Sequence, residues 1–301
     1  MFVVYICLLS LYPDQMSTTP IKLIECPRDA MQGIHEFIPT AIKAEYINLL
    51  LQVGFDTIDF GSFVSEKAIP QLKDTSEVLS RLDLGSSVSK LLAIVANLRG
   101  AQAASTHEAI AYLGFPFSIS ETFQQRNTNA SIAQSMDTVK QLLEICDKKN
   151  KEAVIYLSMG FGNPYGDPWN AEIVTHWADE LVSAGAVILA LSDTTGVSTP
   201  EKIQELMPVL INRFSDIEIG LHLHSTPDTR FEKIEAAYAC GCRRFDSALK
   251  GFGGCPMAAD ELTGNMATED LISYFSAKAE PLNLNMEKWQ EAVSFSQKVF
   301  L

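Results

Sequence analysis

Apolar runs of strand length recur along the chain and alternate with longer amphipathic segments. Eight such runs are present, at Lys22–Cys26, Thr57–Phe63, Leu91–Asn97, Ala111–Ser118, Ala153–Met159, Val187–Ser192, Glu218–His224 and Arg244–Leu249. Near-continuous apolar strands are typical of a parallel sheet covered by helices, because parallel strands need crossover connections. Eight strand–helix units in one domain favour a closed (β/α)₈ barrel, the TIM barrel, over an open doubly wound sheet.

The amphipathic segments between these runs predict the covering helices. The clearest are Lys43–Val53, Ser131–Lys148, Glu172–Ala184, Pro200–Phe214 and Thr229–Cys240. Thr199 stands before a first-turn proline, which is the pattern of a helix N-cap. Gly185 and Gly241 stand where a C-cap glycine leads into the next strand. Two further segments, Thr268–Lys278 and Met286–Leu301, predict extra C-terminal helices after the last strand.

The first residues of the chain do not fit this alternation. Met1 to Tyr12 is almost wholly apolar and carries no Lys or Arg. A membrane span needs about 20 apolar residues, and a secretory signal begins with a basic region. We therefore interpret residues 1–15 as an extension or a misassigned start before Met16, with a weak export signal as the alternative. Residues 16–301 are then expected to form a single barrel domain.

Composition narrows the function classes. The chain has 301 residues, of which 47% are hydrophobic and 20% are charged, as in a globular protein with a large core. Its net charge of −14 and the lack of a Lys/Arg run argue against a nucleic-acid partner, and we expect no membrane partner. The six irregularly spaced cysteines do not resemble a secreted disulfide scaffold. We interpret them as reduced thiols of a cytoplasmic protein.

A histidine pair closes the seventh predicted strand, at His222 and His224. Active sites of (β/α)₈ barrels lie at the C-terminal ends of the strands, so polar residues there are the first candidates for chemistry. Residues two apart on a strand share a face, and both imidazoles would point the same way. That spacing suits two ligands of one metal ion. The alternative is one core histidine and one surface histidine.

Charged residues lie at comparable places on other strands. Arg28 and Asp29 follow the first predicted strand, Asp59 lies in the second, and Asp193 ends the sixth. Asp29 offers a hard oxygen to a cation, and Arg28 offers a positive fork to a developing oxyanion. The alternative for Arg28 and Asp29 is a surface ion pair. Asp193 lies in a polar turn that could equally be structural.

The loop after the eighth predicted strand, Gly251–Pro256, contains three glycines and Cys255. Glycines let a backbone move or approach a ligand closely, and a thiol in such a loop is a candidate acid, base or nucleophile. The alternative is a flexible linker with an incidental cysteine. Asn265 follows and offers an amide oxygen.

Taken together, these motifs resemble the 3-hydroxy-3-methylglutaryl-CoA (HMG-CoA) lyase family. The resemblance runs in order from about Ile21 to the C-terminal helices. It rests on Cys26-Pro27-Arg28-Asp29-Ala30-Met31-Gln32, Ser62-Phe63-Val64-Ser65, His222-Leu223-His224, Gly251-Phe252-Gly253-Gly254-Cys255-Pro256, Gly264-Asn265 and Glu269-Asp270-Leu271. The family belongs to a superfamily of metal-dependent barrel lyases and acyl transferases. The glycine-rich Cys255 loop is the most specific element, and it separates the lyases from isopropylmalate and homocitrate synthases.

The resemblance implies a metal-dependent retro-Claisen cleavage of an acyl-CoA, giving acetyl-CoA and acetoacetate. By this resemblance Asp29, His222, His224 and Asn265 hold Mg²⁺ or Mn²⁺, with Zn²⁺ as an alternative. Family members commonly pair, so a homodimer is expected as well.

The resemblance also implies roles for the remaining candidates. Arg28 stabilises charge on the thioester oxygen, and Cys255 is the general acid or base. The other residues implied are Asp59 and Asp193 as catalytic carboxylates, and Gln32 and Ser62, with Arg28, as substrate contacts.

Four positions depart from the family pattern. Ala30 replaces a glycine, Asp59 a longer glutamate, Ser225 an acid that commonly follows the second histidine, and His35 a more basic residue. An altered substrate is therefore one alternative, either a different 3-hydroxyacyl-CoA or a 2-oxo acid in a related aldol or Claisen reaction. A catalytically inactive barrel that serves as a scaffold is the other.

Overall fold

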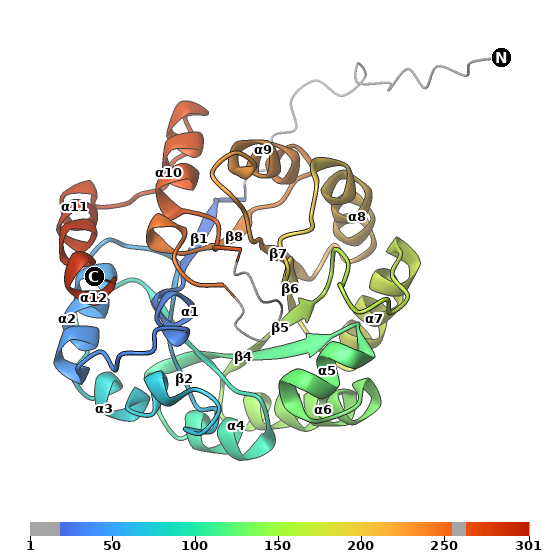
Figure 1. The fold of residues 1–301 in the computed structure, drawn as a ribbon, viewed down its shortest axis with the longest axis horizontal. Coiled ribbons are helices and arrows are strands. Elements are labelled where there is room, and N and C mark those ends of the chain that lie inside the picture. The colour runs from blue at the N-terminus through green and yellow to red at the C-terminus, as the bar shows by residue number, and fades with distance from the viewer. Residues whose placement is uncertain (1–18, 255–262, 301) are drawn as a thin grey trace.

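The structure, a computed structural model, describes residues 19–254 and 263–300. Eight parallel strands follow one another around a closed barrel, and helices surround it (Figure 1). The strands are β1 (Lys22–Glu25), β2 (Thr57–Ser62), β3 (Lys90–Ile94), β4 (Ile110–Ser118), β5 (Glu152–Ser158), β6 (Ile188–Ser192), β7 (Glu218–His222) and β8 (Arg244–Ser247). Strand β1 pairs with β8, with Lys22 opposite Arg244, which closes the barrel. The predicted (β/α)₈ barrel is confirmed.

The helices match the predicted long segments within a few residues. They are α1 (Pro27–Gln32), α2 (Thr40–Leu51), α3 (Thr75–Leu79), α4 (Leu98–Ser105), α5 (Glu121–Thr128), α6 (Ile132–Lys148), α7 (Ala171–Ser183), α8 (Pro200–Arg213), α9 (Arg230–Ala239), α10 (Thr268–Ala277), α11 (Met286–Phe295) and α12 (Gln297–Phe300), with short 3₁₀ turns η1 (Pro70–Leu72) and η2 (Leu249–Gly251). The Thr199 side chain caps α8 by accepting from the Lys202 N–H. Gly185 and Gly241 have φ of 108° and 92°, as C-cap glycines require.

The inside of the barrel has an apolar side and a charged side. An apolar cluster that includes Leu92, Tyr156 and Ile188 comes from strands β3 to β6. Strand β8 instead contributes two buried charges, Arg244 and Asp246, which are 1% and 2% exposed. A Cβ on Gly220 would lie 2.6 Å from the Arg244 side chain, so the glycine in β7 makes room for this cation. The barrel interior is therefore not a uniform apolar core.

Of the predicted C-terminal helices, α11 and α12 lie beside α2 on the outside of the barrel, and α10 packs against α9 (Figure 1). Trp289 of α11 packs edge-on against Phe55, and Phe300 of α12 packs edge-on against Tyr46, each with ring centroids 5.8 Å apart. The segment predicted as one helix from Met286 is divided into α11 and α12. Leu301 and the proposed extension at residues 1–15 lie outside the described residues.

Two simple properties complete the description. Of the helices in residues 19–254 and 263–300, none combines the length and the apolar character that crossing a membrane requires. The cysteines in the same ranges, Cys26, Cys146, Cys240 and Cys242, are all free thiols.

Candidate active site

Arg28 and Asp29 reach the C-terminal end of the barrel on helix α1, which begins directly after β1. The sequence suggested a surface loop as the alternative for this segment, whereas both residues are buried, with 8% and 5% exposure. Pro27 occupies the first helical position, and Asp29 lies in the first turn, where a carboxylate is favoured by the helix dipole. The surface ion pair is thus ruled out by burial.

The histidine pair extends past the end of β7. His222 is the last residue of the strand, and His224 forms an isolated antiparallel bridge with Asn265. The predicted strand to His224 is therefore two residues too long. The two rings still face the same region, with centroids 5.5 Å apart. The bridge to Asn265 replaces strand pairing as the support that fixes His224.

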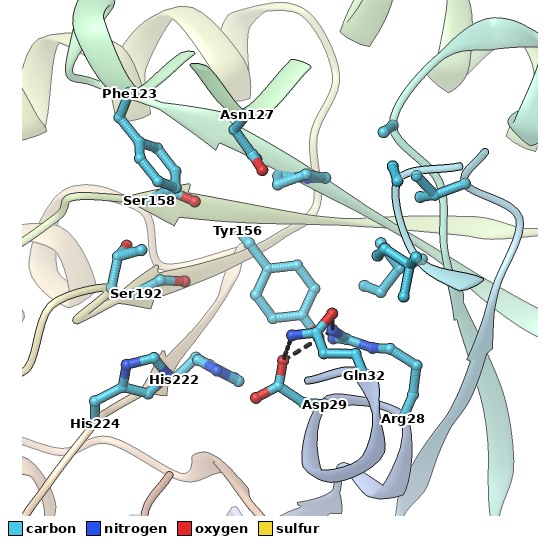
Figure 2. A pocket seen from close by; sticks show the side chains of 17 residues that line it. Arg28, Asp29, Gln32, Phe123, Asn127, Tyr156, Ser158, Ser192, His222 and His224 are labelled. Carbon is cyan, nitrogen blue, oxygen red and sulfur yellow. Dashed lines mark hydrogen bonds and ion pairs between the residues drawn. The ribbon is translucent and has the colours of Figure 1, made fainter. Parts of the chain in front are cut away.

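Asp29, His222 and His224 converge on one point (Figure 2). One ligand atom from each lies within 4.8 Å of the others, and all three residues are buried in this cluster. The Asn265 amide lies beside it, with Nδ2 donating to Asp29 Oδ2 at 2.5 Å. The same Nδ2 donates to the Phe252 carbonyl oxygen at 2.8 Å, so the half-turn of the amide that would present Oδ1 to the cluster breaks both hydrogen bonds. Two imidazoles, a carboxylate and an amide oxygen are a donor set that fits Mn²⁺, Mg²⁺ or Zn²⁺.

The glycine-rich loop approaches this cluster closely. A Cβ on Gly253 would lie 2.7 Å from the Asp29 carbonyl oxygen and 2.8 Å from Asn265 Nδ2, and φ at this residue is +94°. Only glycine fits such a position without strain. The described part of the loop therefore lies against the ligand cluster. Cys255 lies outside the described residues, so its role stays a prediction.

Arg28 is clamped between two carboxylates. Its Nε donates to Asp59 Oδ2 at 3.0 Å, its Nη2 donates to the same oxygen at 2.5 Å, and its Nη1 donates to Asp29 Oδ1 at 2.8 Å. Burial alone would raise the pKa of Asp29, but Arg28 and the two histidines outweigh it and lower the pKa to about 2. Burial raises the pKa of Asp59 to about 6, against the opposing effect of Arg28. Both carboxylates are thus ionised at neutral pH.

The two histidines have different partners. His222 Nδ1 lies 3.3 Å from Asp246 Oδ2 in β8. Burial alone would lower the pKa of His222, but the hydrogen bond and charge of Asp246 outweigh it and raise that pKa. A carboxylate at Nδ1 favours the tautomer whose Nε2 lone pair is free to bind a metal. For His224, burial and the neighbouring His222 lower the pKa to about 4, which leaves a neutral ring at pH 7.

Asp246 was not predicted from the sequence, although a signal was present. Arg244 and Asp246 are two apart in an otherwise buried strand, so both side chains point into the barrel. Arg244 Nη1 donates to Glu218 Oε1 at 3.0 Å, and its Nε lies 3.8 Å from Asp246 Oδ1. A charged network therefore underlies His222.

The remaining predicted residues divide into two groups. Gln32 lines the pocket and donates to Asp29 Oδ1 at 2.6 Å. Ser62 and Asp193 do not line it: Ser62 Oγ accepts from the Val64 N–H at 3.2 Å, and Asp193 accepts from Ser198 Oγ at 2.5 Å. Ser62 shapes the turn after β2, and Asp193 holds the turn after β6.

The pocket beside the cluster has a mixed lining. Its polar members include strand-end residues that sequence reasoning missed, namely Tyr156, Ser158, Ser192 and Thr194. Its apolar members include Val64, Ile69, Ile94, Pro116 and Phe123. Figure 2 shows Arg28, Asp29 and Gln32 on α1 facing His222 and His224. Arg28 supplies the positive charge among the described lining residues.

Comparison with known proteins assigns the family. A sequence model of the HMGL-like family matches residues 21–295. The chain is 33% identical over 287 residues to the cytoplasmic 3-hydroxy-3-methylglutaryl-CoA lyase of Rattus norvegicus, which covers 94% of this chain and 82% of the rat protein. It is 32% identical to the hydroxymethylglutaryl-CoA lyase of Bacillus subtilis (strain 168), with 95% of this chain and 94% of that protein covered.

Comparison with solved structures supports the same family. The crystal structure of the Bacillus subtilis HMG-CoA lyase superposes with a TM-score of 0.87 at 32% identity and covers 93% of this chain and 94% of that one. An HMG-CoA lyase from Acinetobacter baumannii, in complex with coenzyme A and 3-methylmalate, gives a TM-score of 0.86 at 29% identity, with 93% and 91% covered. Because these matches span nearly the whole barrel, the chain belongs to the HMGL-like family, that of the HMG-CoA lyases.

Proposed function

We propose that the protein cleaves 3-hydroxy-3-methylglutaryl-CoA to acetyl-CoA and acetoacetate with the help of a divalent metal ion. The observation that carries the proposal is the convergence of Asp29, His222 and His224 beside Arg28, in a chain of the HMG-CoA lyase family. A scaffold protein would gain nothing from burying these ionisable groups together, since isolated buried charges are costly.

The metal would be held by Asp29, His222 and His224, with Asn265 as a fourth ligand. When bound, such an ion supplies Lewis-acid polarisation of the substrate oxygens. The mixed nitrogen and oxygen donor set makes Mg²⁺ or Mn²⁺ the first choice, and Zn²⁺ the alternative.

The hydrogen bonds of Arg28 fix its guanidinium in place and leave one N–H group free for a substrate oxygen. A guanidinium has five N–H donors. Nε and one Nη2–H bond Asp59, and the two Nη1–H groups bond Asp29 and Gln32. One Nη2–H remains for the substrate. Because the group is clamped, it needs little reorganisation to stabilise negative charge that develops on the thioester oxygen.

The reaction then requires two proton movements and no change of oxidation state. The C3 hydroxyl loses its proton to a base, its oxygen becomes the ketone of acetoacetate, and the C2–C3 electron pair becomes the enolate of acetyl-CoA. Cys255 would return a proton to that enolate carbon from the glycine-rich loop. Apolar lining residues such as Ile69, Ile94 and Phe123 suit the substrate's methyl group, and polar ones such as Ser158 and Ser192 suit its oxygens.

The test is a substrate panel with metal replacement. Metal-free protein is reloaded with Mg²⁺, Mn²⁺ or Zn²⁺, and acetoacetate is measured from HMG-CoA. We expect activity that depends on metal and is lost in Asp29→Ala. The same panel includes other 3-hydroxyacyl-CoAs and 2-oxo acids, and turnover of one of these alone would assign a related aldol or Claisen reaction. Protein that binds no divalent ion and turns over no substrate would point to a scaffold.

A further inference from the structure

His222 belongs to a second cluster of possible metal ligands, which lies at the Nδ1 side of its ring, next to Asp246. Cys26, His222 and Asp246 each offer one ligand atom within 4.8 Å of the others, and all three are buried. Cys26 comes from the junction of β1 and α1, and Asp246 comes from β8. This inner cluster shares one imidazole with the outer cluster of Asp29, His222 and His224.

The ligand atoms of the inner cluster make few or long hydrogen bonds to the rest of the described protein. Asp246 Oδ1 is buried and accepts no hydrogen bond from the described residues, with Arg244 Nε too far away for one, at 3.8 Å. The other carboxylate oxygen, Oδ2, lies 3.3 Å from His222 Nδ1. Within residues 19–254 and 263–300, the Cys26 thiol makes a single long hydrogen bond of 3.7 Å, to the Ile24 carbonyl oxygen. A buried carboxylate oxygen without a partner normally has a water or an ion beside it. The unpartnered oxygen therefore points independently to a ligand here.

The charges around the thiol favour a cation. Three buried carboxylates, those of Asp246, Asp59 and Asp29, lie around this cluster. Arg28 pairs with Asp29 and Asp59, and Arg244 Nε lies 3.8 Å from Asp246 Oδ1. Because three carboxylates face two guanidiniums, the group keeps a net negative charge.

We propose that Cys26, His222 Nδ1 and Asp246 form an inner site for a thiophilic divalent cation, of the class of Zn²⁺, Cd²⁺ and Co²⁺, and that an ion bound there inhibits the outer site. A thiolate, an imidazole and a carboxylate are ligands that such ions accept, whereas the harder Mg²⁺ and Mn²⁺ bind a thiolate poorly. The thiolate of Cys26, which the outer cluster lacks, therefore selects against the ions expected to serve the outer site.

The inhibition follows from the proton balance of one ring. As the cation binds, the Cys26 thiol releases its proton to solvent and a sulfur–metal bond forms. The proton on His222 Nδ1 moves to Nε2, so that the Nδ1 electron pair binds the ion. A neutral imidazole has one free electron pair, and Nε2 then has none to offer to Asp29 and His224. The two sites cannot both use His222.

The first experiment follows binding and does not depend on the proposed lyase reaction. Co²⁺ or Cd²⁺ is titrated into the metal-free, full-length chain, and the thiolate-to-metal charge-transfer band is recorded. We expect a band in the wild-type protein that is lost in Cys26→Ala. The matched control is Cys146→Ala, because Cys146 is a buried free thiol that belongs to neither cluster. Cys26→Ser, of similar size, replaces the alanine variant if that variant does not fold.

The second experiment follows inhibition. With Mn²⁺ at a saturating level, Zn²⁺ or Cd²⁺ should inhibit the wild type. Adding more Mn²⁺ should raise the concentration of Zn²⁺ or Cd²⁺ that is needed to halve turnover. In Cys26→Ala that concentration should rise about 10-fold or more, because losing even a group that only supports a ligand weakens binding by that factor. Basal turnover with Mn²⁺ alone should not change. Equal inhibition of both proteins would mean that Zn²⁺ acts at the outer cluster, and it would overturn the proposal. A band that survives Cys26→Ala and disappears in Cys255→Ala would overturn it as well.

Discussion

The most informative single substitution outside the outer cluster of Asp29, His222 and His224 is Asp246→Asn. The carboxylate holds His222 Nδ1 at 3.3 Å and is itself wholly buried, with no exposed side-chain surface. An asparagine of the same size presents either its oxygen or its NH₂ group to the ring. In the second case Nδ1 becomes an acceptor, and the ring proton moves to the nitrogen that should bind the metal.

The expected magnitude follows from the geometry. Removing a carboxylate that supports a metal-bound histidine costs about 10- to 100-fold in metal affinity. A strong charge-assisted bond measures about 2.7–2.9 Å, and the distance here is longer, at 3.3 Å. The lower part of the range applies, so we expect the dissociation constant for Mn²⁺ to rise by about 10- to 30-fold. The fold should survive, since Arg244 keeps its bond to Glu218 at 3.0 Å.

The assay is a Mn²⁺ titration of metal-free protein by calorimetry, with turnover measured at each Mn²⁺ concentration. High Mn²⁺ should restore much of the lost turnover. The matched control is Asp74→Asn, which makes the same change at a largely buried carboxylate paired with Lys43, away from both metal clusters. A folded Asp246→Asn protein whose Mn²⁺ affinity equals that of the control would refute the reasoning.

Three other predictions test separate parts of the site and fold. Cys255→Ala should lower turnover by about 10²-fold or more and leave Mn²⁺ binding intact, and unchanged turnover would remove the thiol from the mechanism. Arg28→Lys should lower kcat by about 10²-fold or more without rescue by added metal, because one ammonium cannot bond Asp59 twice and still reach the substrate. Burial raises the pKa of Glu25 from 4.5 to about 8, so between these values the native state holds a proton that the unfolded state has lost. The free energy of unfolding should therefore fall as pH rises through this window, by up to about 1.4 kcal/mol per pH unit. Urea titrations at several pH values should show a flatter dependence in Glu25→Gln, and an identical slope would contradict the assignment.

The barrel was predictable because its two periodicities are both strong in this sequence. Continuous apolar runs such as Ala153–Met159 and long amphipathic segments such as Ser131–Lys148 leave little ambiguity between strand and helix. Helix α1 was missed for a physical reason: its six residues make fewer than two turns, too few for a helical period to show. That short helix nevertheless decides the site, because it buries Arg28 and Asp29 where a loop would expose them.

The candidate site was predictable where spacing along one strand carries the information. His222 and His224 share a side because residues two apart do so. The pair Arg244 and Asp246 has the same spacing, but its link to His222 depends on the register of β7 against β8, which places Asp246 opposite His222. Tyr156 carries no such motif, and its ring lies edge-on against His222 with centroids 5.7 Å apart. Sequence reasoning places a strand in the barrel more easily than it places two side chains against one another.

The support of His224 shows how a departure from the family pattern is accommodated. The family resemblance leads one to expect an acid at Ser225, which is instead a small buried residue packed against Met266 Sδ at 3.8 Å. Lys233 of α9 donates to the His224 carbonyl oxygen at 2.8 Å and lies 3.2 Å from Asp193. The backbone of His224 is thus fixed by a buried lysine from the following helix, while the ring of His222 is fixed by a carboxylate from β8. Asp193 also donates its backbone N–H to the His222 carbonyl oxygen at 2.9 Å, a bond that a side-chain substitution keeps. A side-chain change at Asp193 should therefore act through Lys233 and the position of His224, and leave the hydrogen bond between His222 and Asp246 intact.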